Sequence, residues 1–264
     1  AVGDGVTLNT QAINQAIQDR AQSGGGTVYV PAGTYLTGTI FLEDNITLHL
    51  DSGAIIKGSP NLEDYDPSRN IHTDCGESID KITHVHLIMG RGVSNVAIVG
   101  RGVVDGNGGH FMSDKMLNRT PDVSTRHKGE NRPAQMLCFT ECENIFIDGI
   151  SLIDSPYWDI WLYGCDGAKI NNVTIRNNNS EGDGIDIECS RNVIVTGCDI
   201  AVGDDCITLR SNTLPWMENP KPCENNLISN CVLRSPTCCF RIGFVGDAPI
   251  RNCKIDNVIC HNSR

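Results

Sequence analysis

The sequence has few of the features that mark a membrane protein or a nucleic-acid-binding protein. It lacks a continuous apolar run of about 18 residues, which a transmembrane helix requires. Basic residues are outnumbered, with 21 Lys and Arg against 32 Asp and Glu and a formal net charge of -11. A nucleic-acid groove needs clustered basic side chains, so we expect neither a membrane nor a nucleic-acid partner.

Aromatic residues are also scarce, at 5% of the chain, whereas glycine is abundant at 27 residues. Few large side chains and many turn formers favour short, repeated strands. No signal peptide is recognisable, and the opening residues from Ala1 to Gly5 are typical of a mature terminus. We therefore expect a secreted or periplasmic protein.

The thirteen cysteines do not show the paired spacing of a zinc site. A free cysteine behaves as a small buried hydrophobe, and we expect most of them to be reduced core residues. The vicinal Cys238 and Cys239 have no accompanying ligand pair, so we expect no metal.

A repeat dominates the sequence after a short cap. Residues 9–21 have apolar side chains on one helical face, and Gly24 to Gly26 stop the helix. After residue 40, a motif of Asn, alternating apolar residues and a small turn residue recurs from Asn95, Asn144 and Asn192, each followed by an alternating strand. A period of this length indicates a solenoid, because stacked coils bury the apolar side of each strand together.

The turn residues that end the motif are Gly149, Asn172, Gly197, Asn230 and Asn252. This alignment predicts that Cys198, Cys231 and Cys253 form one column facing the core. We predict an all-β fold, a right-handed parallel β-helix with a short N-terminal capping helix. It forms one domain over residues 1–264, with the cap at about 1–40, a projecting loop at about 110–130 and further coils after residue 264.

Two acidic motifs lie one repeat apart, at Glu181-Gly-Asp183-Gly-Ile-Asp186 and at Gly203-Asp204-Asp205. Neighbouring coils are about 4.8 Å apart, so Asp183, Asp204 and Asp205 can converge. Crowded carboxylates raise at least one pKa, which suits a pair of acid and base in glycoside hydrolysis. A Ca²⁺ site and ordinary Asp-Gly turns are alternatives that the residues leave open.

These motifs resemble the paired signature of glycoside hydrolase family 28, the polygalacturonases and their relatives. The segments Asn131-Arg-Pro133, Gly149-Ile-Ser-Leu152 and Ser155-Pro-Tyr-Trp158 are also similar to that family. The resemblance implies a right-handed parallel β-helix and inverting hydrolysis without a cofactor. It also implies that Asp204 is the general acid and that Asp183 and Asp205 hold and activate the attacking water. We expect Asp186 to be structural.

The sequence departs from the family at several positions. Cys238 stands where the family has a histidine, and Trp161 also replaces a histidine. Arg241 could bind a uronate carboxylate through its planar fork, although a salt bridge is equally compatible with the sequence. We include Arg210, Arg241, Cys238 and Trp161 as candidate substrate-binding residues. The Arg-x-Lys motif that binds the substrate carboxylate in the family comes after the histidine segment, and it is not found between Cys238 and residue 264.

The predicted function is hydrolysis of α-galacturonide-type linkages in pectin, as in a polygalacturonase or a rhamnogalacturonan hydrolase. The partner is an acidic plant cell-wall polysaccharide, and we expect a monomer. Two alternatives are a non-catalytic carbohydrate-binding β-helix with a degenerate site and a β-helix polysaccharide lyase.

Overall fold

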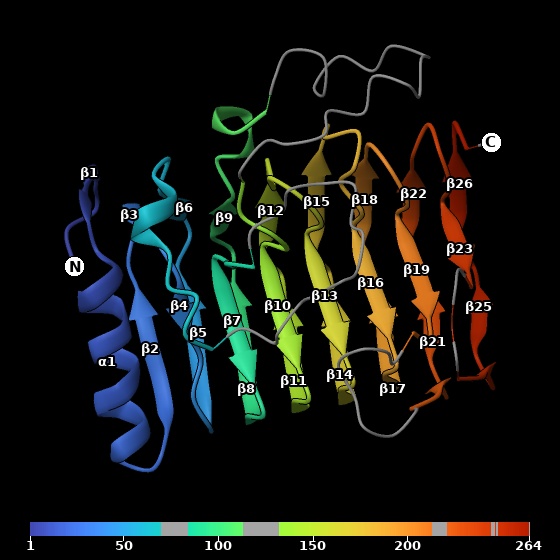
Figure 1. Cartoon of the computed structure of the whole chain (residues 1–264), viewed down its shortest axis with the longest axis horizontal. Coiled ribbons are helices and arrows are strands. Elements are labelled where there is room, and N and C mark those ends of the chain that lie inside the picture. The colour runs from blue at the N-terminus through green and yellow to red at the C-terminus, as the bar shows by residue number, and fades with distance from the viewer. Residues whose placement is uncertain (70–83, 113–131, 213–220, 244–245, 247, 264) are drawn as a thin grey trace.

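The computed structural model describes residues 1–69, 84–112, 132–212, 221–243, 246 and 248–263. In these residues the chain winds into a stack of coils, and most coils add one strand to each of three parallel sheets. Figure 1 shows the coils following one another from the N-terminal helix to the last strands. The expected right-handed parallel β-helix is thereby confirmed. The loop expected at about residues 110–130 lies largely outside the described residues.

The three sheets are named A, B and C. Sheet A contains β1 (Asp4–Leu8), β3 (Gly33–Thr37), β6 (Ala54–Gly58), β9 (Val103–Asp105), β12 (Ser151–Ile153), β15 (Thr174–Asn177), β18 (Asp199–Val202), β22 (Val232–Arg234) and β26 (Ile259–His261). Sheet B contains β2 (Gly26–Val30), β5 (Ile46–Leu50), β8 (Ser94–Gly100), β11 (Glu143–Asp148), β14 (Asp166–Asn171), β17 (Arg191–Thr196), β20 (Cys223–Glu224), β21 (Leu227–Ser229), β24 (Ile250–Arg251) and β25 (Lys254–Asp256). Sheet C contains β4 (Ile40–Phe41), β7 (Ile88–Arg91), β10 (Leu137–Thr140), β13 (Ile160–Tyr163), β16 (Ile185–Glu188), β19 (Ile207–Arg210) and β23 (Phe240–Ile242).

The capping helix α1 (Thr10–Gln22) lies beside the first coil, next to β2 in Figure 1. Its buried residues are Ile13 and Ile17. It ends where Gly24 and Gly25 take positive φ angles of 94° and 103°, which glycine adopts without strain. Two short 3-10 helices, η1 (Leu62–Asp64) and η2 (Gly108–His110), follow strands β6 and β9 of sheet A in the chain. None of the helices in the described part of the chain is long and apolar enough to cross a membrane.

The core consists of columns of equivalent side chains from successive coils. In sheet B, Ile147, Ile170, Val195 and Ile228 occupy one register position and are fully buried. This follows from the period of two along each strand, because alternate side chains point into the coil and stack on their counterparts. The twelve cysteines in the described residues are free, and nine of them are buried.

Turn asparagines form a ladder along the outside of the stack. The side chain of Asn95 donates to Asn45 over 2.9 Å, and that of Asn144 donates to Asn95 over 2.7 Å. All three residues have positive φ, a conformation that asparagine tolerates better than other side-chain-bearing residues. The repeated motif seen in the sequence therefore places the same turn on each coil.

The repeat alignment predicted for the last coils was wrong. The strand register places Cys231 directly over Cys198, but the next residue in that column is Val258 and not Cys253. Cys253 precedes β25 in sheet B, and the neighbouring Asn252 pairs with Asn225. Asn252 and Asn257 both take positive φ and pair with an asparagine of the preceding coil, Asn225 and Asn230 respectively, so a turn asparagine alone did not show which corner it marks.

Candidate active site

The acidic residues lie in the turns that lead from sheet A to sheet C. Asp183 precedes β16, Asp205 precedes β19 and Cys238 precedes β23, each by two residues. Because these strands pair in register, the three side chains occupy the same position on three consecutive coils. Parallel stacking thereby gathers residues that are 22 and 33 positions apart in the sequence.

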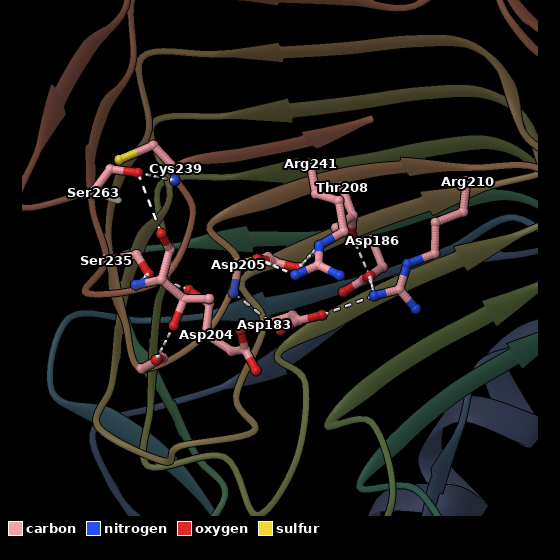
Figure 2. Close-up of polar contacts among 12 residues, drawn as sticks. Asp183, Asp186, Asp204, Asp205, Thr208, Arg210, Ser235, Cys239, Arg241 and Ser263 are labelled. Carbon is pink, nitrogen blue, oxygen red and sulfur yellow. Dashed lines mark hydrogen bonds and ion pairs between the residues drawn. The ribbon is translucent and has the colours of Figure 1, made fainter. Parts of the chain in front are cut away.

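The three predicted catalytic carboxylates are brought together. One oxygen from each of Asp183, Asp204 and Asp205 lies within 4.8 Å of the others. The backbone N–H of Asp205 donates to Oδ1 of Asp183 over 3.1 Å, which ties the two coils together at this point. Asp183 and Asp205 are buried, whereas Asp204 is partly exposed and is the carboxylate most open to a ligand (Figure 2).

The guanidinium group of Arg210 contacts two buried carboxylates on one side of the cluster. Nη2 of Arg210 lies 3.0 Å from Oδ2 of Asp183 and 3.1 Å from Oδ1 of Asp186. The hydroxyl of Thr208 also donates to Asp186. The guanidinium carbon of Arg210 lies 4.5 Å from the ring centroid of Trp158, a cation–π contact. Arg210 therefore neutralises the neighbourhood of Asp183 only in part.

Burial and crowding favour protonated carboxyl groups here. Burial raises the pKa of Asp183 well above its usual value, and repulsion from Asp186 adds to the effect, while Arg210 opposes it. Burial likewise raises the pKa of Asp186 to about 6. The cluster therefore holds at least one proton at mildly acidic pH, as an acid–base site requires.

The guanidinium of Arg241 approaches the other side of the cluster. Its Nε lies 2.5 Å from Oδ2 of Asp205, and its Nη2 donates to Oδ1 over 3.3 Å. Beside this pair, burial and the negative charge of Asp205 raise the pKa of Cys238, which stays a neutral thiol. The sequence could not separate a salt bridge from a free substrate-binding role for Arg241, and the geometry supplies the salt bridge.

The candidate Trp161 lies beneath the site and not on its surface. Its side chain is 4% exposed, and its indole N–H donates to Oε2 of Glu188 over 2.9 Å. The partly exposed ring next to Asp183 is Trp158, which stacks on Tyr157 with centroids 4.8 Å apart and an angle of 17°. Trp158 ends the Ser155-Pro-Tyr-Trp158 segment and Trp161 comes three residues later. The sequence does not say which of the two rings faces solvent.

A buried ion pair fixes the turn that carries Asp183. Arg132 donates to Glu181, with side chains that are 3% and 9% exposed, and it also donates to the carbonyl of Pro156 over 3.0 Å. The amide of Asn179 donates to the same carbonyl over 2.9 Å. Glu181 belongs to the first acidic motif of the sequence, but its partner could not be found there, because the two residues are 49 positions apart.

The donor set does not suit Ca²⁺, the alternative that the sequence left open. Calcium takes 6 to 8 oxygen ligands at about 2.3–2.6 Å. Here Arg210 and Arg241 already contact Asp183 and Asp205 and place two positive charges at the cluster. The arrangement fits acid–base chemistry between carboxyl groups better than cation binding.

Glu188 was missed by the sequence analysis and should make the stability of the protein pH-dependent. Burial raises its pKa from 4.5 to about 7, against the attraction of Arg210 and the hydrogen bond from Trp161. Between these values the unfolded chain has lost the proton that the folded chain keeps, so the free energy of unfolding falls as pH rises. Glu188 by itself should account for a loss of roughly 3 kcal/mol over this window.

Replacement Glu188→Gln should remove this contribution, since glutamine does not titrate, whereas Asp183 and Asp186 keep theirs. Urea unfolding at several pH values between 4.5 and 7 measures the slope for both proteins. Identical slopes in the wild type and the variant would show that Glu188 does not hold a proton in the folded state.

Comparison with known proteins places this geometry in a family. The model of the family "Glycosyl hydrolases family 28" matches residues 25–257. A "Probable polygalacturonase" from Vitis vinifera is 28% identical over 223 residues, which are 80% of this chain and 42% of that protein. An "Exo-poly-alpha-D-galacturonosidase" from Dickeya chrysanthemi is 26% identical over 273 residues, covering 89% of this chain and 44% of that protein.

The fold agrees with a solved structure over the whole chain. A hyperthermoactive exopolygalacturonase from Thermotoga maritima superposes with a TM-score of 0.81 at 25% sequence identity, covering 100% of this chain and 65% of the other. The chain thus spans less than half the length of the two curated relatives and about two thirds of the solved one.

Proposed function

Because the chain belongs to glycosyl hydrolases family 28, we propose that it hydrolyses α-galacturonide-type linkages in a pectic polysaccharide. The observation that carries this proposal is the meeting of three acidic side chains from neighbouring coils, within 4.8 Å, inside the matched residues. The curated relatives named above act on polygalacturonate by their names, which supports the choice of substrate class.

In the proposed reaction, Asp204 is the general acid. It is the partly exposed member of the cluster, and it protonates the glycosidic oxygen as the bond to the anomeric carbon breaks. Asp183 and Asp205 hold a water molecule and direct its oxygen to the anomeric carbon, and the ionised one of the two accepts its proton. Acid–base chemistry of this kind needs one protonated and one ionised carboxyl group, and crowded carboxylates favour such a division.

We further propose inversion at the anomeric carbon, which is general to the family. The separation of 4.8 Å or less is shorter than the roughly 6.5–9.5 Å of most inverting glycosidases. Inversion requires that the water held by Asp183 and Asp205 attack from the face of the sugar opposite to the bond that Asp204 protonates. The remaining proposals are a secreted or periplasmic location, a monomer and no partner other than the polysaccharide.

Incubation with polygalacturonate tests the function. We expect new reducing ends without the ultraviolet absorbance of unsaturated ends, and proton NMR of the first products should show the inverted anomer. Unsaturated ends would identify a lyase instead. Sugar binding measured by calorimetry without any release of reducing ends would identify a non-catalytic binding protein, the reading motivated by Cys238 in place of a histidine.

A further inference from the structure

Two buried carboxylates of the cluster have different access to positive charge. Asp183 shares one guanidinium with Asp186, at 3.0 and 3.1 Å. Both oxygens of Asp205 are in contact with the guanidinium of Arg241. A buried carboxylate stays ionised only when a partner charge compensates the loss of water, so the two groups are prepared for different protonation states.

The position of Arg241 on the next coil explains this contact. It lies on β23 in register with Thr208 of β19, which in turn is in register with Asp186 of β16. Its side chain is 33% exposed, whereas that of Asp205 is 3% exposed. Figure 2 shows Arg241 and Arg210 approaching the acidic cluster together with Thr208. The arginine therefore reaches the carboxylate from the open side of the sheet.

The groups that face Asp205 come from three coils. Asp183 accepts the backbone N–H of Asp205 from the preceding coil, and Asp204 is its neighbour in the chain. From the following coil come Arg241 and the thiol of Cys238, which is neutral and offers no charge. Two acidic neighbours and one cation surround Asp205, so the charge state of this carboxylate depends on Arg241.

We propose that Arg241 is a positioning residue that holds Asp205 as the ionised, correctly oriented carboxylate that takes the proton from the attacking water. This inference rests on the proposed function and deepens it. A carboxylate offers about four lone-pair sites, so the contacts to Arg241 leave room for a water molecule. As the water oxygen bonds to the anomeric carbon, its proton passes to Asp205, and the departing oxygen takes the proton of Asp204.

This role differs from the capture of a substrate carboxylate, which the sequence also allowed for Arg241. Two of its nitrogens already contact Asp205, and its remaining N–H groups are compatible with a contact to substrate, so geometry alone does not separate the two roles. The two roles are separable by kinetics. Loss of a substrate contact raises KM with kcat unchanged, whereas loss of base positioning lowers kcat and changes its pH dependence.

The test compares Arg241→Gln, Arg241→Lys and the control Arg234→Gln on polygalacturonate between pH 3 and 8. Arg234 pairs with Asp199 in sheet A across the same two coils, so its loss removes an arginine–aspartate pair outside the site. We expect Arg241→Gln to lower kcat about 100-fold and to move the acid limb of the profile upward by about one pH unit or more. Arg241→Lys should recover part of both effects, and Arg234→Gln neither.

An unchanged pH profile in Arg241→Gln, or a rise in KM alone, would overturn the proposal. Carbon-13 NMR of labelled aspartate carboxyl groups tests the charge pairing without activity, since the carboxyl signal of Asp205 should shift in Arg241→Gln and stay in place in Arg234→Gln. If the wild type releases no reducing ends while this NMR shift is seen, the proposed function fails and the pairing stands. An absent shift in a folded variant contradicts the pairing itself.

Discussion

Replacement of Asp204 by asparagine is expected to lower kcat on polygalacturonate by about 10²–10⁴-fold, with little change in KM. Asparagine keeps the shape of the side chain but has no acidic proton for the departing oxygen. The backbone around the residue should be unaffected, because the carbonyl of Asp204 accepts its hydrogen bond from Ser235 in either protein. Initial rates of reducing-end release at several substrate concentrations give both constants.

The control and a rescue experiment make this prediction specific. Asp148→Asn alters an aspartate at a turn of sheet B that accepts a bond from Asn172, and it should leave the rate unchanged. An aryl galacturonide with a good leaving group needs little protonation, so Asp204→Asn should recover part of its activity on that substrate. Turnover of polygalacturonate by Asp204→Asn at the wild-type rate would exclude Asp204 as the general acid.

Replacement of Arg132 by methionine is expected to destabilise the protein by about 3–5 kcal/mol. The change leaves Glu181 buried at 7% exposure without its cation and also removes the bond to the carbonyl of Pro156. For a chain of this size the melting temperature should fall by roughly 10 °C. Activity should fall as well, because Glu181 lies two positions before Asp183 in the same turn.

A double variant and a surface pair provide the comparison. Arg132→Met with Glu181→Gln removes both charges and should recover much of the stability lost in the single variant. The exposed pair of Arg251 with Glu224 should contribute less than about 1 kcal/mol, so Arg251→Met serves as the matched control. Equal melting temperatures for Arg132→Met and the wild type would mean that the pair does not fix this turn.

Much of the architecture could be predicted from the sequence. The strands that follow Asn95, Asn144 and Asn192 have alternating apolar residues, and only the stacking of successive coils buries these side chains. The capping helix was predicted from the apolar side chains on one of its faces. The meeting of Asp183 with Asp204 and Asp205 was predicted for the same reason, because residues one coil apart become neighbours in parallel stacking. The assignment of catalytic roles to these residues stays a prediction.

Other features could not be predicted in the same way. The column that begins with Cys198 and Cys231 continues with Val258, because the last coil has a turn asparagine at two corners and the sequence does not say which of them belongs to this column. Trp161 and Trp158 belong to one motif, and only the packing shows that the former is buried. The pairing of Arg132 with Glu181 joins segments with no shared repeat position.

The sequence by itself determined the solenoid and the presence of an acidic cluster. The register between coils depends on side-chain alternation and coil length, and both can be counted in the sequence. The tertiary structure alone decided which arginine serves which carboxylate. Arg241 contacts Asp205, whereas Arg210 contacts both Asp183 and Asp186. A long, flexible arginine side chain can reach several positions on adjacent coils. Which carboxylate it contacts depends on the burial and charge at each position, and the spacing of residues in the sequence does not give these.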